Sequence, residues 1–364
     1  MPPKRRRYGI CFIVIVILMA WLAWPFFNPE DNQNLPHQLV AQLTGSEAIS
    51  DSTVYDVGGT DLGIIVKHDG QYLFIFGDTF SSPSMTGNWR SNTIAISEDT
   101  DPSDGISVDS WVLNPTSGYA KELISSLKVD NIEMTCIPTA AVSLFGNLYV
   151  YYMSVRHWSE IGGIWTCNNA SIAVSTNNGQ SFTKMTNISW AGNSNFVLFG
   201  VAQPTSMDSS FLYLLSTPAG RFGACYLSRV EKMQILNQSA YQYYTGMTTM
   251  GDPIWSSDPE DSSQVFSAPV GEVSLMWNEY LDKWTAFYTD NVAYSIVVRS
   301  SEYLWGPWSE PFTIVDAEEY PSLYGSFVHP DYVENSGETT YFIMSIFTEY
   351  NTFLMSVDVG SLLD

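Results

Sequence analysis

A turn followed by a short strand of alternating aromatic and aliphatic residues recurs five times along this chain. Successive copies begin about 57 to 76 residues apart, at Gln71–Phe76, Asn147–Tyr152, Ser210–Leu215, Lys283–Tyr288 and Thr340–Ser345. Alternation with a period of two is typical of β-strands, and near-regular repetition of a strand–turn–strand unit is typical of propeller blades. The sequence therefore predicts an all-β, five-bladed β-propeller, with a β-sandwich as the structural alternative. Helical periodicity is nearly absent, and only Tyr119–Leu127 is expected to form a short helix.

The N-terminal region divides into three segments before the β-rich body. Residues 1–9 form a basic tail, residues 10–27 contain an uncharged apolar run, and residues 28–45 are polar and read as a stalk in front of a domain at 46–364. The apolar run is just long enough to span a bilayer as a signal-anchor helix, and the basic tail before it predicts a cytosolic N-terminus. A cleaved signal peptide is the alternative. Either reading predicts a body outside the cytosol, held at the membrane or secreted.

Three sequons agree with export, since Asn169, Asn187 and Asn237 each match the N-glycosylation pattern. Three cysteines lie in the body, Cys136, Cys167 and Cys225. Three thiols allow one disulfide, and the sequence does not choose the pair. Without a Cys-x-x-Cys motif and with only four histidines, the chain lacks the usual ligands of a zinc site, so we expect no metal and no cofactor.

The charge balance limits the kinds of partner and substrate that the protein is expected to bind. The 364 residues carry 15 Lys and Arg against 38 Asp and Glu, a net charge of −23. Such an acidic body repels phosphate backbones, so a nucleic-acid partner is not expected, and a polyanionic substrate is disfavoured.

The stretch 54–80 contains a hairpin with a carboxylate beside each strand. Asp69-Gly70 is a two-residue turn signal, Asp61 opens the first strand and Asp78 ends the second. A glycosidase needs two carboxyl groups across a sugar ring, one as acid and one as base or nucleophile. The alternative is that both aspartates only shape turns.

A set of motifs resembles a known family in the order expected of it. The set contains Gly59–Gly63, Phe76–Phe80, Trp89–Asn92, Gly271–Leu275, Trp305–Trp308, Tyr324–Pro330 and Ser345–Asn351. Together they resemble the domain of unknown function 4185, some members of which are endo-D-arabinanases of glycoside hydrolase family 183. The resemblance spans about residues 50–360 and implies a five-bladed propeller that hydrolyses furanoside linkages between D-arabinose units. It also implies that Asp61 and Asp78 are the paired acidic positions.

Other residues near these motifs are candidates for substrate binding. Arg90 and Asn92 follow the second aspartate closely, to bind sugar hydroxyls or, for Arg90, to hold Asp78 ionised. Glu272 is a third candidate acid, or a strand-edge charge. The remaining candidates for ligands at the rim of the channel are His329, Tyr350 and Asn351.

Two functions fit these features. The first is an extracytoplasmic glycoside hydrolase that cleaves arabinofuranoside-type linkages in a glycan with Asp61 and Asp78 as acid and base. The second is a non-catalytic carbohydrate-binding or adhesion propeller at the cell surface.

Overall fold

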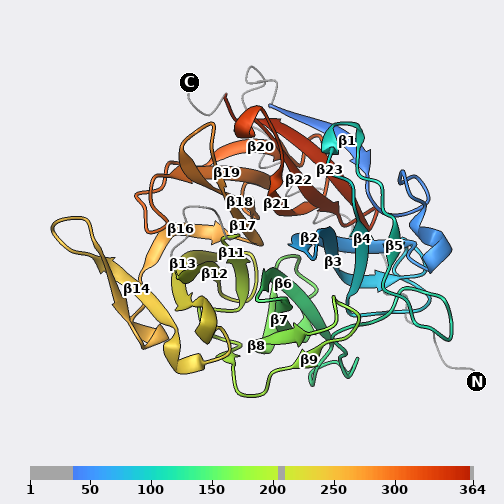
Figure 1. Ribbon diagram of the computed structural model, residues 1–364, viewed down its shortest axis with the longest axis horizontal. Helices are drawn as coiled ribbons and strands as arrows, with labels where there is room; N and C mark the ends of the chain where they lie inside the picture. Colours follow the sequence, from blue (N-terminus) through green and yellow to red (C-terminus); the bar gives the residue numbers. More distant parts are fainter. Residues whose placement is uncertain (1–35, 204–209, 361–364) are drawn as a thin grey trace, which may run out of the picture. The chain divides into compact units, whose positions relative to one another are not determined.

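The computed structural model describes residues 36–203 and 210–360. Over these residues the strands form five antiparallel sheets, each a blade of a β-propeller (Figure 1). Blade 1 contains β2 (Gly59–His68), β3 (Gln71–Phe80), β4 (Thr93–Ser97) and β5 (Ser110–Trp111). Blade 2 contains β6 (Thr135–Leu144), β7 (Asn147–Trp158), β8 (Trp165–Ser175), β9 (Thr183–Lys184) and β10 (Trp190–Ala191).

The other three blades follow in chain order. Blade 3 contains β11 (Leu198–Val201), β12 (Phe211–Thr217), β13 (Gly223–Glu231), β14 (Gln242–Met247), β15 (Pro253–Ser256) and β16 (Gln264–Val270). Blade 4 contains β17 (Val273–Asn278), β18 (Lys283–Asp290), β19 (Ser295–Ser301) and β20 (Phe312–Asp316). Blade 5 contains β21 (Leu323–Glu334), β22 (Thr339–Ile346), β23 (Asn351–Asp358) and, from the other end of the chain, β1 (His37–Gln42).

Helical structure in the described residues is limited to short 3-10 turns. These are η2 (Ser52–Tyr55), η3 (Pro102–Asp104), η4 (Lys232–Gln234), η5 (Gln238–Ala240), η6 (Pro259–Asp261) and η7 (Asn335–Gly337). The helix expected at Tyr119–Leu127 is therefore wrong, because side chains from blade 1 bind the backbone of this segment in an irregular path.

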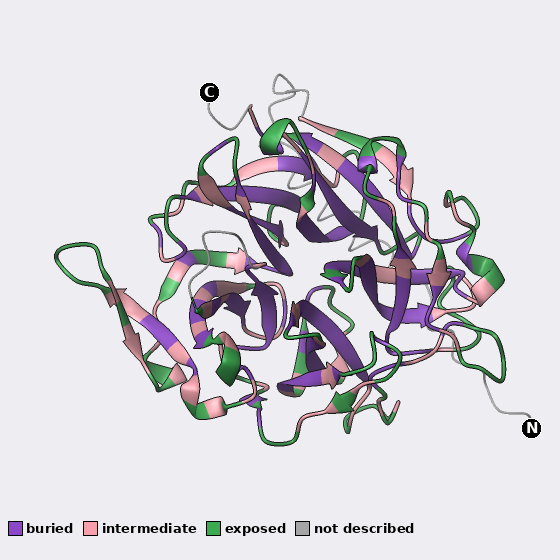
Figure 2. Cartoon of the chain, viewed as in Figure 1, coloured by how far each residue is buried: buried purple, intermediate pink, exposed green. Residues whose placement is uncertain are grey.

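The prediction of five blades is confirmed, and each of the five recurrent aromatic runs lies in the second strand of a blade, in β3, β7, β12, β18 and β22. The first strands β2, β6, β11, β17 and β21 contact one another in a closed ring around the centre (Figure 1). Apolar side chains of neighbouring blades form five core clusters, one at each blade-to-blade interface among the described residues. The purple inner strands of Figure 2 show this burial. Large side chains recur in the second strands because both faces of a blade are covered by its neighbours.

Blade 5 is completed by the N-terminal strand of the described chain. β1 pairs antiparallel with β23, from His37 opposite Val357 to Gln42 opposite Phe353. The stalk expected over 28–45 is thus corrected at its C-terminal end, since residues 37–42 belong to the propeller. As an outer strand, β1 buries little of its surface and contains exposed polar residues such as Gln38. Its composition therefore resembles that of a linker. Residues 28–35 of the stalk, the basic tail and the apolar run 10–27 lie outside the described residues. Within the ranges that are described, no helix is long and apolar enough to span a bilayer.

Candidate active site

The first carboxylate sits on a break in the regularity of β2. The register with β3 shifts on both sides of Leu62, and Leu62 and Gly63 take positive φ values of 68° and 108°. A β-branched or bulky residue rarely adopts such a φ, and strain of this kind is often kept at functional sites. The Leu62 amide donates to Ser345 Oγ at 2.8 Å, which holds the bulge in place. The bulge lies immediately after Asp61 and sets that side chain against Gly77 of β3.

Asp61 has a single hydrogen bond to its carboxyl group among the described residues. The Tyr324 hydroxyl of β21 donates to Oδ2 at 2.9 Å, whereas Oδ1 is inaccessible to solvent and has no partner. A buried oxygen that receives no hydrogen bond disfavours the charged form. Burial raises the pKa of Asp61 to about 8, and the neighbouring Asp78 and Glu272 charges act in the same direction. Asp61 is therefore protonated at neutral pH.

Asp78 has two donors on one oxygen. Trp89 Nε1 donates to Oδ1 at 2.8 Å and Thr135 Oγ1 donates to the same atom at 2.6 Å. Burial raises the pKa of Asp78 to about 6, while these two hydrogen bonds and the charge of Lys128 oppose that rise. Lys128 lies over the Trp89 ring at 5.4 Å from its centroid and pairs with Glu122. Asp78 is thus mainly ionised at neutral pH.

The two aspartates form a pair with unequal protonation. Their charges interact, since Asp78 raises the pKa of Asp61. Environments that push the pKa values of two carboxyl groups apart assign one as acid and the other as base or nucleophile. The arrangement is chemically suited to acid–base hydrolysis of a glycosidic bond.

Glu272 lies between β16 and β17 and is engaged by an arginine. Arg221 Nε lies 2.9 Å from Glu272 Oε1 and 3.0 Å from Oε2, and its NH2 group lies 2.8 Å from Oε1. This bidentate pair uses both oxygens of the carboxylate. Glu272 is close enough to affect the charge of Asp61, but it is bound as the counter-ion of Arg221 and not as a strand-edge charge in solvent.

A small cavity occupies the centre of the ring. It has a volume of about 20 Å³ and is lined by residues from every first strand and by Glu272, with mostly apolar side chains such as Leu62, Pro138, Val273 and Phe327. A space of this size holds about one water molecule. A sugar ring does not fit inside it, and neither Asp61 nor Asp78 is among its lining residues.

Arg90 lies near Asp78 in sequence but turns to another partner. Its guanidinium donates to the Asp56 carboxylate at 3.3 Å, to the Asp56 carbonyl and to the Ala120 carbonyl at 3.3 Å. Only 4% of Arg90 is exposed. The charge that favours ionised Asp78 is therefore that of Lys128, and not that of Arg90 as expected. Arg90 instead ties the start of blade 1 to the connection between blades 1 and 2.

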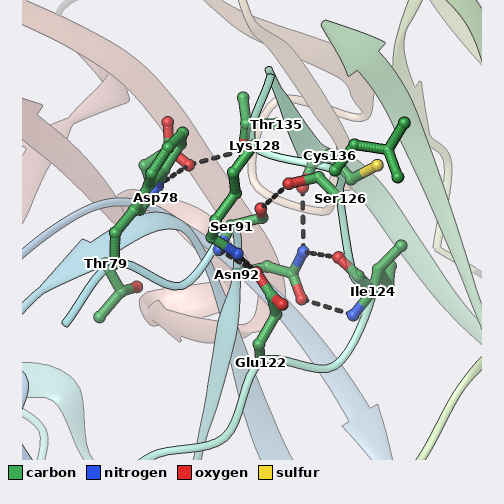
Figure 3. Close-up of polar contacts among 12 residues, drawn as sticks. Asp78, Thr79, Ser91, Asn92, Glu122, Ile124, Ser126, Lys128, Thr135 and Cys136 are labelled. Atoms are coloured by element: carbon green, nitrogen blue, oxygen red, sulfur yellow. Dashed lines mark hydrogen bonds and ion pairs between the residues drawn. The ribbon is translucent and has the colours of Figure 1, made fainter. Parts of the chain in front are cut away.

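Asn92 is also structural. Its Oδ1 accepts from the amides of Leu123 and Ile124, and its Nδ2 donates to the carbonyls of Ile124 and Cys136. Figure 3 shows this side chain directed toward Ile124 and Cys136, with Asp78 and Thr135 bonded to each other beside it. All four hydrogen-bonding sites of the amide are occupied, so none is left for a sugar hydroxyl.

The three C-terminal candidates separate in space. Tyr350 is buried with its ring 5.7 Å from that of Phe80, and burial, followed by the charges of Asp61, Tyr324 and Asp78, raises its pKa well above the ordinary value, so it lies near the two aspartates. His329 is buried beside Tyr72 at 5.6 Å, and burial lowers its pKa to about 4. Asn351 accepts from the Thr44 hydroxyl at 2.9 Å. His329 and Asn351 thus both contact side chains of the propeller itself.

Sequence reasoning missed the residues that set the protonation of the two aspartates. Tyr324 and Thr135 are far from Asp61 and Asp78 in sequence and reach them only because the first strands are neighbours in the ring. Tyr324 stood within the Tyr324–Pro330 motif, which was the available signal. Trp89, at the start of the Trp89–Asn92 motif, acts as a hydrogen-bond donor to Asp78.

The peripheral predictions have mixed outcomes. Asn187 and Asn237 are exposed and Asn169 is half-buried in β8, so two of the three sequons have an exposed asparagine. In the described part of the chain Cys136, Cys167 and Cys225 are free thiols, so the disulfide that their number allowed is not formed.

Comparison with known proteins adds a family and a set of similar folds. A family model for a domain of unknown function, DUF4185, matches residues 47–356. No curated protein is significantly similar in sequence. A provisionally assigned hydrolase from Bacteroides ovatus superposes with a TM-score of 0.58 at 11% identity, over 84% of this chain and 87% of that one. An exo-β-1,3-galactanase from Phanerochaete chrysosporium, solved with β-1,3-galactotriose, superposes with a TM-score of 0.53 at 12% identity, over 89% of this chain and 65% of the galactanase. At such low identity these similarities show the fold alone.

Proposed function

The chain belongs to the DUF4185 family, and from that premise we propose that it is a glycoside hydrolase whose catalytic residues are Asp61 and Asp78. The observation that carries the proposal is the unequal surroundings of the two carboxyl groups. Asp61 has an oxygen without a partner and a pKa of about 8, whereas Asp78 receives two hydrogen bonds and has a pKa of about 6. Two aspartates that only shaped turns would lie exposed with ordinary protonation.

The roles follow from protonation. Asp61 carries a proton at neutral pH and gives it to the leaving oxygen of the glycosidic bond. Asp78 is the carboxylate that activates water or attacks the anomeric carbon. Both groups are held on two paired ten-residue strands of the first blade, so the geometry is fixed before the glycan arrives.

The proposed substrate is a glycan with arabinofuranoside-type linkages, as the resemblance to endo-D-arabinanases implies. The net charge of −23 supports a neutral glycan over a polyanionic one. The small central cavity supports binding across the mouth of the propeller.

The test measures hydrolysis by the purified propeller and its variants Asp61→Asn and Asp78→Asn on arabinan and other furanosides. Each substitution keeps the shape and removes the ionisable group, so turnover should fall by about 10²–10⁴-fold while glycan binding persists. The double variant should be little worse than the slower single variant, because the two groups act as one unit. Near-wild-type turnover in both single variants would exclude the pair from catalysis. Binding without cleavage by the wild type would establish the non-catalytic carbohydrate-binding function instead.

We also propose that the propeller works outside the cytosol, anchored through residues 10–27. The basic tail before that run and the exposed Asn187 and Asn237 support this location. Endoglycosidase treatment of the full chain expressed in a eukaryotic host should lower its apparent mass. Carbonate extraction should leave it in the membrane fraction. A body that carries no glycan and is cleaved by protease only from the cytosolic side would overturn this orientation.

A further inference from the structure

The buried ion pair next to the proposed catalytic residues has no role in the mechanism above. We propose that Arg221 is a positioning residue, which holds the Tyr324 hydroxyl on the Asp61 carboxyl group and is itself held by Glu272. This inference rests on the proposed function only in that Asp61 is taken to be the acid.

Arg221 is held at both its backbone and its side chain. It lies in the connection between β12 and β13, where its amide donates to the Gly163 carbonyl of the β7–β8 connection at 2.9 Å. Its guanidinium is fixed by three contacts of 2.8 to 3.0 Å with Glu272. Blades 2, 3 and 4 therefore all contribute to the place of one side chain.

The plane of the guanidinium lies over aromatic rings. Its central carbon is 4.5 Å from the centroid of the Tyr324 ring and 5.6 Å from that of the Trp165 ring. The guanidinium group of an arginine can stack on an aromatic ring while its edge binds both oxygens of a carboxylate. The ammonium group of a lysine at the same position can do neither. The Arg221 side chain thus restricts the movement of the Tyr324 ring.

Tyr324 in turn determines how the Asp61 carboxyl group is oriented. Its hydroxyl provides the one hydrogen bond that this group has among the described residues, at 2.9 Å to Oδ2. Oδ1 faces Gly77 and has no partner, so no second bond fixes the rotation of the carboxyl plane. Loss of the Tyr324 contact leaves the acid free to turn away from a bound glycan.

The same groups set the charge around Asp61. Asp78 and Glu272 disfavour its ionised form, and the Tyr324 hydroxyl and Arg221 favour it. Tyr350, also packed nearby, interacts with the Asp61 charge. Removing Glu272 or Arg221 should therefore shift the protonation of Asp61 in opposite directions, which a merely structural pair would not do.

The first experiment compares kcat and KM of Arg221→Lys, Tyr324→Phe and the double variant on a cleaved arabinan. We expect Arg221→Lys to lower kcat about 10- to 100-fold with little change in KM, because a misplaced acid affects the chemical step. The double variant should be no slower than Tyr324→Phe alone. Arg299→Lys is the matched control, since Arg299 also lies over an aromatic ring, that of Phe266 at 5.3 Å, but donates to the Tyr288 hydroxyl in blade 4, and it should retain wild-type kcat. Wild-type kcat in Arg221→Lys, or losses that multiply in the double variant, would overturn the proposal.

The second experiment does not depend on turnover. Carboxyl carbon resonances of the propeller, titrated by NMR and assigned with Asp61→Asn, give the pKa of Asp61 directly. Glu272→Gln should lower this pKa and Arg221→Met should raise it. An unchanged pKa in both folded variants would refute the positioning role. Opposite shifts in a protein that cleaves no furanoside would support the role of Arg221 while refuting the proposed hydrolase.

Discussion

At the scale of single residues, hydrogen-bond donors decide which aspartate carries the proton. Asp61 and Asp78 lie on neighbouring strands and are both buried by the same ring, so burial alone would raise both pKa values alike. Asp78 receives two donors and Asp61 one, and in addition the charges of Asp78 and Glu272 raise the pKa of Asp61 while that of Lys128 lowers the pKa of Asp78. Asp61 therefore keeps its proton in part because its Oδ1 atom receives no hydrogen bond.

A first prediction concerns the stability of Asp61→Asn. The folded-state pKa of Asp61 is about 8 against an ordinary 3.8. A raised pKa gives stability that is fully present below the unfolded value and is lost as the pH rises through the folded value. The wild type should therefore lose stability between about pH 4 and pH 8, and Asp61→Asn should not lose this part. We expect the Tm of the variant to exceed that of the wild type by a margin that widens over this range, measured by calorimetry.

The control for this experiment is Asp101→Asn. Asp101 is exposed and bonded to Ser103, which lowers its pKa, so its substitution should not stabilise the protein as the pH rises. A Tm of Asp61→Asn below the wild-type value at pH 8 would contradict the prediction.

A second prediction concerns Gly77, which leaves the space that Asp61 occupies. A Cβ at this position would lie 2.3 Å from Asp61 Oδ1. Gly77→Ala should displace the carboxyl group and lower kcat about 10²-fold, because a shift of about 1 Å at a catalytic group has effects of this size. Gly162→Ala is the control, since a Cβ there meets no atom within 4 Å. Equal activities of the two variants in a furanoside cleavage assay would show that Asp61 tolerates the methyl group.

At the scale of elements, side-chain hydrogen bonds hold residues 122–128 of the connection between β5 and β6. Asn92 binds the backbone of residues 123 and 124 in this segment and of Cys136 in β6, and Glu122 accepts from the Ser91 amide at 2.8 Å. The segment delivers Lys128 and the start of β6, where Thr135 bonds to Asp78 (Figure 3).

A third prediction follows for Asn92→Ala. It leaves buried amides and carbonyls without partners, each worth about 1–3 kcal/mol. We expect a loss of stability of about 2 kcal/mol or more in denaturant titration and faster amide exchange over residues 121–128. Asn187→Ala, at an exposed position, should leave both unchanged. Unaltered exchange in Asn92→Ala would show that the segment is held by other contacts.

The connection between β5 and β6 also shows which features could be predicted from the sequence and which could not. The second strands were predictable, because period-two alternation with flanking turns is a local signal, and Asp61 and Asp78 were found because one hairpin contains both. The path of 119–127 was not, because its helical pattern is overridden by Asn92, a residue about 30 positions away. Arg90 and Asn92 were expected near Asp78 from sequence distance, yet Arg90 binds Asp56 and Asn92 binds the backbone of residues 123, 124 and 136. Partners from other blades, such as Tyr324 and Arg221, have no local signature at all.

At the scale of the whole described molecule, the ring is closed by one pairing between β1 and β23. A fourth prediction tests that closure by deleting residues 36–42 from the full chain. The deletion leaves the outer edge of β23 unpaired, so we expect a lower Tm and concentration-dependent aggregation in light scattering. Leu39→Lys, at a position that is 48% exposed, is the control, and it should show the Tm and the light scattering of the wild type. A deletion variant with unchanged Tm would show that the other blades hold the ring by themselves.

That pairing has a consequence for the order in which the protein is made. Blades 1 to 4 each take their strands from one continuous segment and can form as the ribosome releases them. Blade 5 differs, because its outer strand is the first of the propeller to be synthesised and its other three strands are the last. β1 must therefore wait, unpaired, through the translation of some 300 residues between His37 and its partner Val357. A chain released early, before β23 is complete, would keep an open strand edge that quality-control chaperones recognise.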